Sequence, residues 1–177
     1  MSNEVKLVIL DIDGVMTDGT KLYGVDGMPF AKSYCDKDFT AIKRMRGAGV
    51  KVCFLSGDDT VNLKMAQNRN IDFYSARGKD KAEFLPMLEK VYGVNRKDMV
   101  YLGDDLFDLS IMKAVGHPYC PYDACFEVTN FCGYMNTLSS SGGRNAIVHL
   151  QRVLLQRRLI SDCTIQEIEK LDKKETF

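Results

Sequence analysis

The amino-acid sequence predicts an α/β domain built on a parallel sheet that helices cover on both faces. Short, almost continuously apolar segments alternate along the chain with segments that carry a helical apolar stripe. Such apolar runs are typical of parallel strands, because these strands are buried on both faces. A length of 177 residues is sufficient for one domain with a sizeable core.

Five apolar segments are expected to form the strands. The clearest span residues 5–10, 50–55 and 98–102, and two weaker segments span 71–74 and 117–120. Between them, apolar residues recur at helical spacing, which predicts amphipathic helices. These apolar positions are Phe39, Ile42 and Met45; Phe84, Leu85, Leu88 and Val91; Leu106, Leu109 and Met112; and Ala146, Ile147, Leu150, Val153 and Leu154.

One interval, residues 14–34, interrupts this alternation because it has no helical period. It contains Asp26-Gly27, a pair that favours tight hairpin turns. We therefore expect a β-hairpin flap over about residues 15–34, inserted between the first strand and the first helix. The flap belongs to a single expected domain over residues 1–160. A charged tail follows over residues 161–177, for which a short helix or partial disorder is expected.

Composition excludes several classes of partner. Lys and Arg number 24, as do Asp and Glu, so there is no electrostatic reason to expect nucleic acid or an anionic membrane as a partner. No apolar run approaches the roughly 20 residues that span a bilayer. The first residues lack the features of a secretory signal, which indicates a cytoplasmic protein.

Cysteine and histidine usage points away from thiol and imidazole chemistry. Six cysteines are scattered without a CxxC pair, so reduced and mostly buried thiols are expected rather than structural zinc or disulfides. Only two histidines are present, and neither lies in a recognisable catalytic setting. Catalysis is therefore expected to depend on carboxylates.

Polar residues follow each of the three clearest strands. Asp11 and Asp13 end the first, "LSGDD" (55–59) ends the second and "LGDD" (102–105) ends the third. Ligands of open parallel sheets bind outside the carboxyl ends of the strands. Several carboxylates gathered there need a compensating cation, and an all-oxygen donor set favours Mg²⁺.

Each of these residues also has a purely structural interpretation. Asp commonly caps helices and forms turns, which is the expected role of Asp58 and Asp59 before the next helix. Lys81 opens an amphipathic helix and Ser56 lies at a turn, so either side chain alone carries little weight. Their joint occurrence in this order favours a functional site.

The ordered motifs "DIDG", Ser56, "KDK" and "GDDLFD" resemble the four motifs of the haloacid dehalogenase superfamily of phosphatases. The response-regulator receiver also has an acidic pair after its first strand. In that family, however, the lysine follows the last acidic residue, so this alternative is rejected.

Longer segments resemble the small-cap branch typified by 3-deoxy-D-manno-octulosonate 8-phosphate phosphatase. They cover residues 5 to about 158 and are "DIDGVMTDG", "KDFTAIKRM", "GKDKAEF", "YLGDDLFDLSIMKAVG", "DACFEV" and "GGRNAIVHL". The pattern also occurs in phosphatases of nine-carbon keto acids and in the non-catalytic C-terminal module of animal sialic acid cytidylyltransferases. The resemblance implies a Rossmann-like three-layer α/β/α fold, with the hairpin flap as a minimal cap.

The resemblance implies a Mg²⁺-dependent phosphatase that acts on a sugar phosphate through an aspartyl-phosphate. Asp11 is the implied nucleophile, and Asp13 the acid and then the base. The implied Mg²⁺ ligands are Asp11, the backbone carbonyl of Asp13 and Asp104. Ser56, Gly57 and Lys81 are expected to hold the phosphate, with Asp105 and Asp108 orienting Lys81 or metal-bound water.

Further substrate contacts follow from the same resemblance. Lys37 and Asp38 match a "(K/R)D" segment that contacts substrate in the relatives, although helix entry explains them nearly as well. Arg144 is expected to bind the substrate carboxylate or to close the site, with a surface arginine as the equal alternative. A homotetramer is also implied, in which a neighbouring subunit completes the pocket.

The sequence departs from the branch at positions near the substrate. Asp58 stands in "SGD" where relatives carry arginine, Ala66 replaces a basic residue, and "DFTA" (38–41) lacks the usual glycines. A carboxylate near an anionic substrate disfavours binding. Octulosonate 8-phosphate, a nonulosonate 9-phosphate and a less anionic sugar phosphate therefore all remain open as substrates. A non-catalytic tetramerisation module is disfavoured because the catalytic set is complete.

Overall fold

A five-stranded parallel sheet forms the centre of the computed structural model, which describes residues 4–176. Its strand order is β5-β4-β1-β6-β7, and every neighbouring pair is parallel. The predicted fold class is confirmed, and the strands lie within two residues of the predicted segments. The strands are β1 (Leu7–Leu10), β4 (Lys51–Ser56), β5 (Asp72–Ser75), β6 (Met99–Leu102) and β7 (His117–Tyr119).

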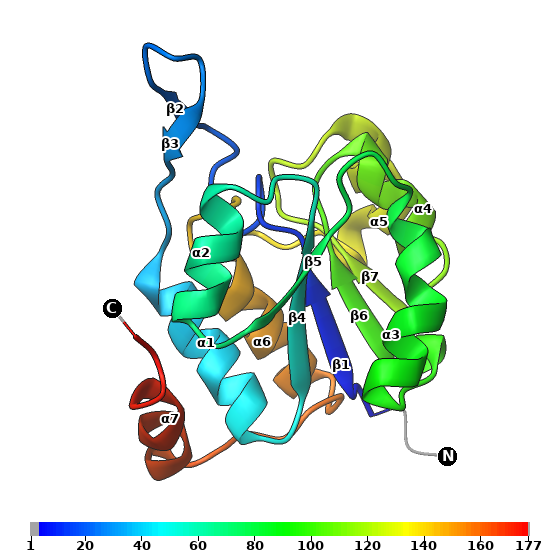
Figure 1. Cartoon of the computed structure of the whole chain (residues 1–177). Coiled ribbons are helices and arrows are strands. Elements are labelled where there is room, and N and C mark those ends of the chain that lie inside the picture. Colours follow the sequence, from blue (N-terminus) through cyan, green and yellow to red (C-terminus); the bar gives the residue numbers. More distant parts are fainter. Residues whose placement is uncertain (1–3, 177) are drawn as a thin grey trace.

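Helices cover both faces of this sheet, which gives three layers (Figure 1). On one face lie α1 (Asp36–Gly47), α2 (Val61–Asn68) and α6 (Ala146–Gln156); on the other lie α3 (Leu85–Tyr92), α4 (Leu109–Met112) and α5 (Phe126–Asn136). Strand β1 supplies both cores, because Val8 and Leu10 pack into the first and Leu7 and Ile9 into the second. The 3-10 turns are η1 (Lys81–Phe84), η2 (Arg96–Asp98) and η3 (Leu106–Asp108).

Two predicted apolar stripes differ in detail from the structure. Val91 is 58% exposed, because the buried face of α3 runs through Leu85, Leu88 and Tyr92 instead. The stripe from Leu106 to Met112 is divided between η3 and α4. A reciprocal capping box between Asp105 and Asp108 tightens its first turn into a 3-10 helix.

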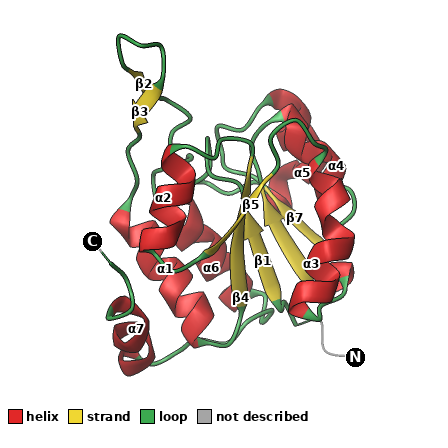
Figure 2. Ribbon diagram, viewed as in Figure 1, coloured by secondary structure: helices red, strands yellow, loops and turns green. Residues whose placement is uncertain are grey.

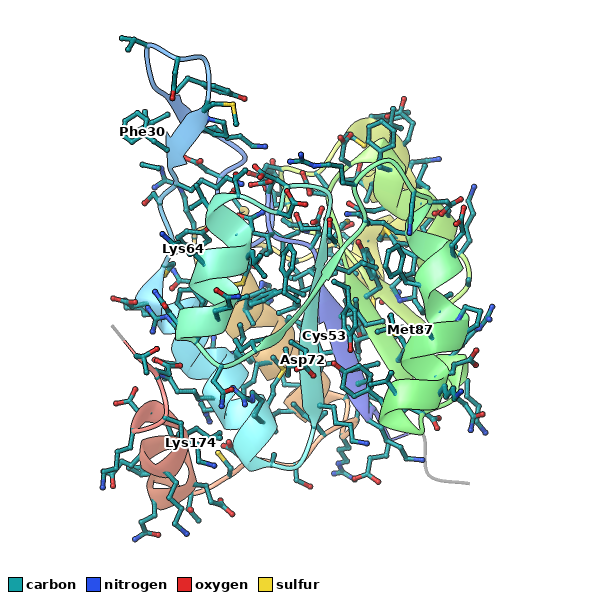
Figure 3. The ribbon with its side chains drawn as sticks, in the orientation of Figure 1. Phe30, Cys53, Lys64, Asp72, Met87 and Lys174 are labelled. Atoms are coloured by element: carbon teal, nitrogen blue, oxygen red, sulfur yellow. The ribbon has the colours of Figure 1, made fainter. Side chains whose placement is uncertain are left out.

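The predicted hairpin flap is present and stands away from the layered body (Figure 2). Its strands β2 (Leu22–Tyr23) and β3 (Pro29–Ala31) are antiparallel, and Gly27 in the turn between them has φ +74°. Figure 3 shows Phe30 pointing away from the body, and this side chain is 65% exposed. The flap rises on the side toward which the sheet strands point (Figure 1).

The charged tail contains helix α7 (Ile165–Asp172), which packs beside α1. The buried ammonium of Lys43 on α1 joins the two, through ion pairs to Asp172 at 2.5 Å and Glu175 at 3.1 Å. Within residues 4–176, none of the helices is both long and apolar enough to cross a membrane.

Candidate active site

The carboxyl ends of β1, β4 and β6 bring the predicted polar residues together. A cavity of about 1090 Å³ opens there, between the strand ends and the flap. This is the location that an open parallel sheet favours for a ligand. The predicted site residues that line the cavity are Asp11, Asp13, Ser56, Gly57, Lys81, Asp104, Asp105 and Asp108.

Asp11 follows β1 directly and is almost fully buried, with 7% of its surface exposed. Its Oδ1 accepts a hydrogen bond from the backbone N–H of Ile12 at 2.7 Å, and its Oδ2 lies 2.8 Å from the Lys81 ammonium. Burial raises the pKa of Asp11 to about 7, against the opposing effect of Lys81. Both oxygens are therefore held in fixed directions.

Lys81 begins η1 and bridges two carboxylates, Asp11 and Asp108, the latter at 2.6 Å. Burial alone would lower the pKa of Lys81, but these two carboxylates outweigh it and raise the pKa above the ordinary value. The ammonium therefore remains charged beside Asp11.

Asp108 holds Lys81 in place from a fully buried position. It accepts a hydrogen bond from the Tyr101 hydroxyl at 2.6 Å, and from the backbone N–H groups of Asp104 and Asp105 at 2.9 and 3.1 Å. Asp105 itself accepts the N–H of Leu106 at 2.7 Å and caps η3. Of the two residues expected to orient Lys81, the structure places Asp108 against it and Asp105 at the cavity edge.

The acidic cluster of Asp11, Asp104 and Asp108 has the chemistry of a metal site. One oxygen from each residue lies within 4.8 Å of the others. Oδ1 of Asp104 is buried and has no hydrogen-bond partner among residues 4–176. Burial, and then the carboxylates of Asp11 and Asp108, raise the pKa of Asp104 to about 8. A buried, unpartnered carboxylate oxygen beside a second carboxylate fits a divalent cation that prefers oxygen ligands.

The backbone at Gly14 makes this arrangement possible. A Cβ atom at this position would lie 1.9 Å from Oδ2 of Asp104, and the residue has φ +80°. Only glycine combines that conformation with so close an approach. The glycine of "DIDG" is thus required for Asp104 to reach the end of β1.

Asp13 faces the flap rather than the acidic cluster. The Lys32 ammonium donates to its two oxygens at 2.7 and 3.0 Å, and Lys21 lies 3.5 Å from its Oδ2. The side-chain amide of Asn62 on α2 donates to the same oxygen at 3.4 Å. These three partners were not predicted from the sequence. For Lys32 the sequence does contain a signal. Lys32 and Tyr34 are two residues apart, so in an extended segment both side chains lie on the same side.

Ser56 at the end of β4 is buried, and its hydroxyl accepts a hydrogen bond from Asn62 at 3.2 Å. The next residues were expected to cap α2, and this expectation is wrong because the N-cap residue of α2 is Thr60 and no side chain caps the helix there. Instead, Asp58 pairs with the flap, 2.8 Å from Lys32 and 2.9 Å from Lys21.

These contacts determine the charge state of Asp58. Burial would raise the pKa of Asp58, but hydrogen bonds from Lys32, Thr60 and Lys21 hold it well below the ordinary value. The Asp58 carboxylate is therefore ionised and pairs with two lysines of the flap.

The predicted substrate contacts outside these motifs do not reach the cavity of this chain. Asp38 is buried on α1, where its Oδ1 accepts the N–H groups of Ile147 and Val148 at 2.9 and 3.1 Å. It stabilises the start of α6 because carboxylates favour helix N-termini. Lys37 lies on the exposed side of α1 and does not line the cavity.

Arg144 is exposed and also lies outside the cavity. The glycines before it nevertheless touch the turn that follows β1. The N–H of Gly143 donates to the carbonyl of Val15 at 2.9 Å, and a Cβ on Gly142 would lie 1.9 Å from the carbonyl oxygen of Gly14. The segment before α6 thus supports the loop that carries Asp11 and Asp13.

Comparisons with known proteins agree with this geometry, although no family model matches the chain. The 3-deoxy-D-manno-octulosonate 8-phosphate phosphatase KdsC of Haemophilus influenzae is 32% identical over 153 residues, which cover 86% of this chain and 83% of that protein. The cobalt-bound structure of the H. influenzae phosphatase YrbI matches with a TM-score of 0.78 and 31% identity, over 87% of this chain and 89% of that one.

A more distant structure shares the fold alone. The Moraxella catarrhalis 3-deoxy-D-manno-octulosonate 8-phosphate phosphatase, in complex with magnesium, phosphate and KDO, matches with a TM-score of 0.78, 22% identity and 88% coverage of both chains. A Streptomyces avermitilis structure described as a putative HAD family hydrolase matches with a TM-score of 0.78 and 25% identity, over 90% of both chains.

With its motifs, cavity and curated relative in agreement, the chain belongs to the 3-deoxy-D-manno-octulosonate 8-phosphate phosphatase family of haloacid dehalogenase-fold hydrolases.

Proposed function

We propose that this protein is a Mg²⁺-dependent phosphatase of a sugar phosphate monoester, with 3-deoxy-D-manno-octulosonate 8-phosphate as the favoured substrate. The observation that carries the proposal is the buried Asp11 carboxylate, which Lys81 and Ile12 hold in a cluster with Asp104, whose Oδ1 is buried and has no hydrogen-bond partner among the described residues. The names of the curated relative and of the H. influenzae structure support the choice of substrate.

Asp11 acts as the nucleophile. One of its carboxylate oxygens attacks phosphorus to form an aspartyl-phosphate, and the bond to the sugar oxygen breaks. Asp13, at the cavity wall, gives a proton to that leaving oxygen and becomes the carboxylate that the Lys32 ammonium contacts. The resulting Asp13 carboxylate then takes a proton from water as the water attacks phosphorus, which releases inorganic phosphate and regenerates Asp11.

Asp11 and Asp104 of the acidic cluster, together with the backbone carbonyl of Asp13, would hold Mg²⁺. When bound, the ion neutralises repulsion between carboxylate and phosphate and stabilises the transferring oxygens. We propose that the Ser56 hydroxyl, the Gly57 backbone and the Lys81 ammonium hold the phosphate. Asp108 holds the Lys81 ammonium beside Asp11 through its 2.6 Å ion pair. For Asp105, at the cavity edge, we propose a bond to metal-bound water.

The flap lysines remove the repulsion that Asp58 alone would exert on a sugar acid. Lys21 and Lys32 together balance the charges of Asp58 and Asp13, and Lys21 also lines the cavity. Arg77 and Lys79 add positive charge to the cavity wall. A nonulosonate 9-phosphate satisfies the same charges, and it is the second substrate candidate.

We further propose a homotetramer with a cytoplasmic location. The flap exposes Leu22, Tyr23, Val25, Met28 and Phe30, a set of apolar side chains that self-association would bury. Within such an assembly, Lys37 and Arg144 would serve the cavity of a neighbouring subunit. The six free cysteines of the structure are consistent with a reducing compartment.

Phosphate release tests the proposed function. The protein is incubated with octulosonate 8-phosphate, a nonulosonate 9-phosphate, glucose 6-phosphate and p-nitrophenyl phosphate, with Mg²⁺ or with EDTA. We expect Mg²⁺-dependent turnover that is fastest with a keto-acid phosphate and is abolished in Asp11→Asn. Turnover of no substrate, or activity that survives Asp11→Asn, would overturn the mechanism; a preference for glucose 6-phosphate would overturn the substrate class alone.

A further inference from the structure

A lysine of the flap is buried directly behind Asp13. Lys32 follows β3, and its side chain has no exposed surface. Its ammonium makes four contacts: 2.7 and 3.0 Å to the two oxygens of Asp13, 2.8 Å to Asp58 and 2.9 Å to the Asn62 carbonyl oxygen. Removing an ammonium from water is costly unless charged and polar partners surround it, as they do here.

Asn62 extends this arrangement to the phosphate side of the cavity. This fully buried side chain accepts hydrogen bonds from Lys32 and from the Tyr34 hydroxyl, both at 2.9 Å. Its amide donates to Ser56 at 3.2 Å and to Asp13 at 3.4 Å. Because each hydrogen-bonding group of Asn62 is engaged, the relative positions of Lys32, Asp13 and Ser56 are fixed.

Lys32 does not line the cavity in which the substrate would bind. The cavity wall includes Asp13, Lys21 and Asp58 but not Lys32. Any effect of Lys32 on the reaction therefore passes through the residues that it contacts, and the proposed proton-transfer residue among them is Asp13, whose two oxygens it holds at once. A carboxylate held by both oxygens has one accessible orientation, whereas a free carboxylate has several.

We propose that Lys32, braced by Asn62 and Asp58, is a positioning residue that orients Asp13 for proton transfer and so makes this step depend on the seating of the flap. Lys32 and Tyr34 lie on the arm that returns from the flap to α1, so their contacts also fix the base of the flap. The inference rests on the proposed function, since it assumes that Asp13 transfers the proton.

The leaving group separates positioning of Asp13 from a general loss of structure. A sugar alkoxide must be protonated as it departs, whereas p-nitrophenolate leaves without a proton. In Lys32→Met, kcat/KM for octulosonate 8-phosphate should fall by about 10²-fold, the usual size of a general-acid contribution. For p-nitrophenyl phosphate it should change little, and Lys32→Arg should recover part of the loss.

Lys43→Met is the matched control. Lys43 is likewise a buried lysine paired with two carboxylates, but it lies on α1 beside the tail, and its substitution should reduce stability without changing the ratio of the two substrates. A crystal structure of Lys32→Met should show the Asp13 carboxylate in a different orientation. If Lys32→Met does not fold, Lys32→Gln retains donors without the charge and takes its place.

Asp13→Asn separates the acid role of Asp13 from the positioning role of Lys32. It should reproduce the selective loss on the sugar phosphate. If Asp13→Asn shows no such selectivity, the acid role in the proposed function is wrong. If Asp13→Asn is selective but Lys32→Met lowers both substrates equally, or leaves both unchanged, the proposed function stands and the role of Lys32 is overturned.

Discussion

The ammonium of Lys81 forms ion pairs with two buried carboxylates, at 2.8 Å from Asp11 and 2.6 Å from Asp108. This arrangement serves catalysis and stability together. It directs one oxygen of Asp11 toward the lysine, and it prevents repulsion between two acidic side chains that follow neighbouring strands. The loss of Lys81 is therefore expected to affect both properties.

Lys81→Met is predicted to lower kcat by about 10²–10³-fold, as expected when a donor that stabilises developing charge is removed. It should also reduce the free energy of unfolding by roughly 3–5 kcal/mol, because Asp11 and Asp108 are left buried without their counter-ion. Steady-state kinetics and urea unfolding measure the two effects. Lys90→Met, an exposed lysine on α3, is the control, and equal behaviour of the two variants would contradict the prediction.

The sequence identifies some site residues better than others, for a physical reason. Asp11, Asp13 and Asp104 lie directly at strand ends, where a short motif reveals them. Lys32 and Asn62 lie in a flap arm and on a helix, and only the packing of these elements brings them to Asp13. A contact between residues 13 and 62 has no local signal that a single sequence could reveal.

Among the elements, α6 depends on a distant residue. Its first turn carries no side-chain cap of its own, and Asp38 of α1 accepts two of its N–H groups. This contact crosses more than 100 positions of the chain. Asp38 belongs to the "(K/R)D" segment that we expected to contact the substrate, and this contact with α6 gives it a structural role instead.

Asp38→Ala is predicted to reduce the free energy of unfolding by about 1–2 kcal/mol, the usual cost of removing an acceptor at a helix N-terminus. Asp38→Asn keeps one acceptor oxygen and should cost less. Urea denaturation followed by circular dichroism measures the difference. A substitution that leaves stability intact but raises KM would instead return Asp38 to substrate binding.

The strands β1, β4 and β6 were predicted within two residues because burial on both faces leaves a nearly continuous apolar signal. The apolar stripes of the helices were predicted less accurately. The sequence does not distinguish an apolar residue on the buried face from an apolar residue next to that face. Val91 was included in a stripe whose packing position Tyr92 occupies. The capping box of Asp105 and Asp108 makes the segment after β6 begin with a 3-10 turn, which hydrophobic periodicity cannot predict.

For the molecule as a whole, metal removal and pH are expected to be coupled. The pKa of Asp11 is raised to about 7 and that of Asp104 to about 8, from an ordinary value of 3.8. Between pH 3.8 and these raised values, Asp11 and Asp104 hold protons in the folded state that the same carboxyl groups have released in the unfolded state. The stability of the metal-free protein should therefore fall as pH rises from about 4 to 8.

Thermal unfolding in EDTA and in Mg²⁺ tests this coupling. The Mg²⁺-induced rise in Tm should be larger at pH 8 than at pH 5, because protons compete with the cation for the same carboxylates. Asp104→Asn should flatten the pH dependence and abolish the response to Mg²⁺. An equal rise at both pH values would contradict the assignment.

The apolar flap is expected to control assembly of the subunits. Phe30→Asp places a charge on the apolar flap and should convert the proposed tetramer to smaller species, as measured by light scattering, without lowering the Tm of the subunit. Val91→Asp is the matched control, because Val91 is an equally accessible apolar residue on α3. A wild-type protein that is monomeric at micromolar concentration would overturn the tetramer.

The central position of β1 also constrains how the protein is made. This strand comes first in sequence, yet its partners β4 and β6 are completed only at Ser56 and Leu102. During vectorial synthesis, β1 must therefore wait for more than half of the chain before both of its edges are paired. A nascent chain halted before residue 104 contains the nucleophile without the acidic residue that completes its site, so chemical competence arrives late in translation.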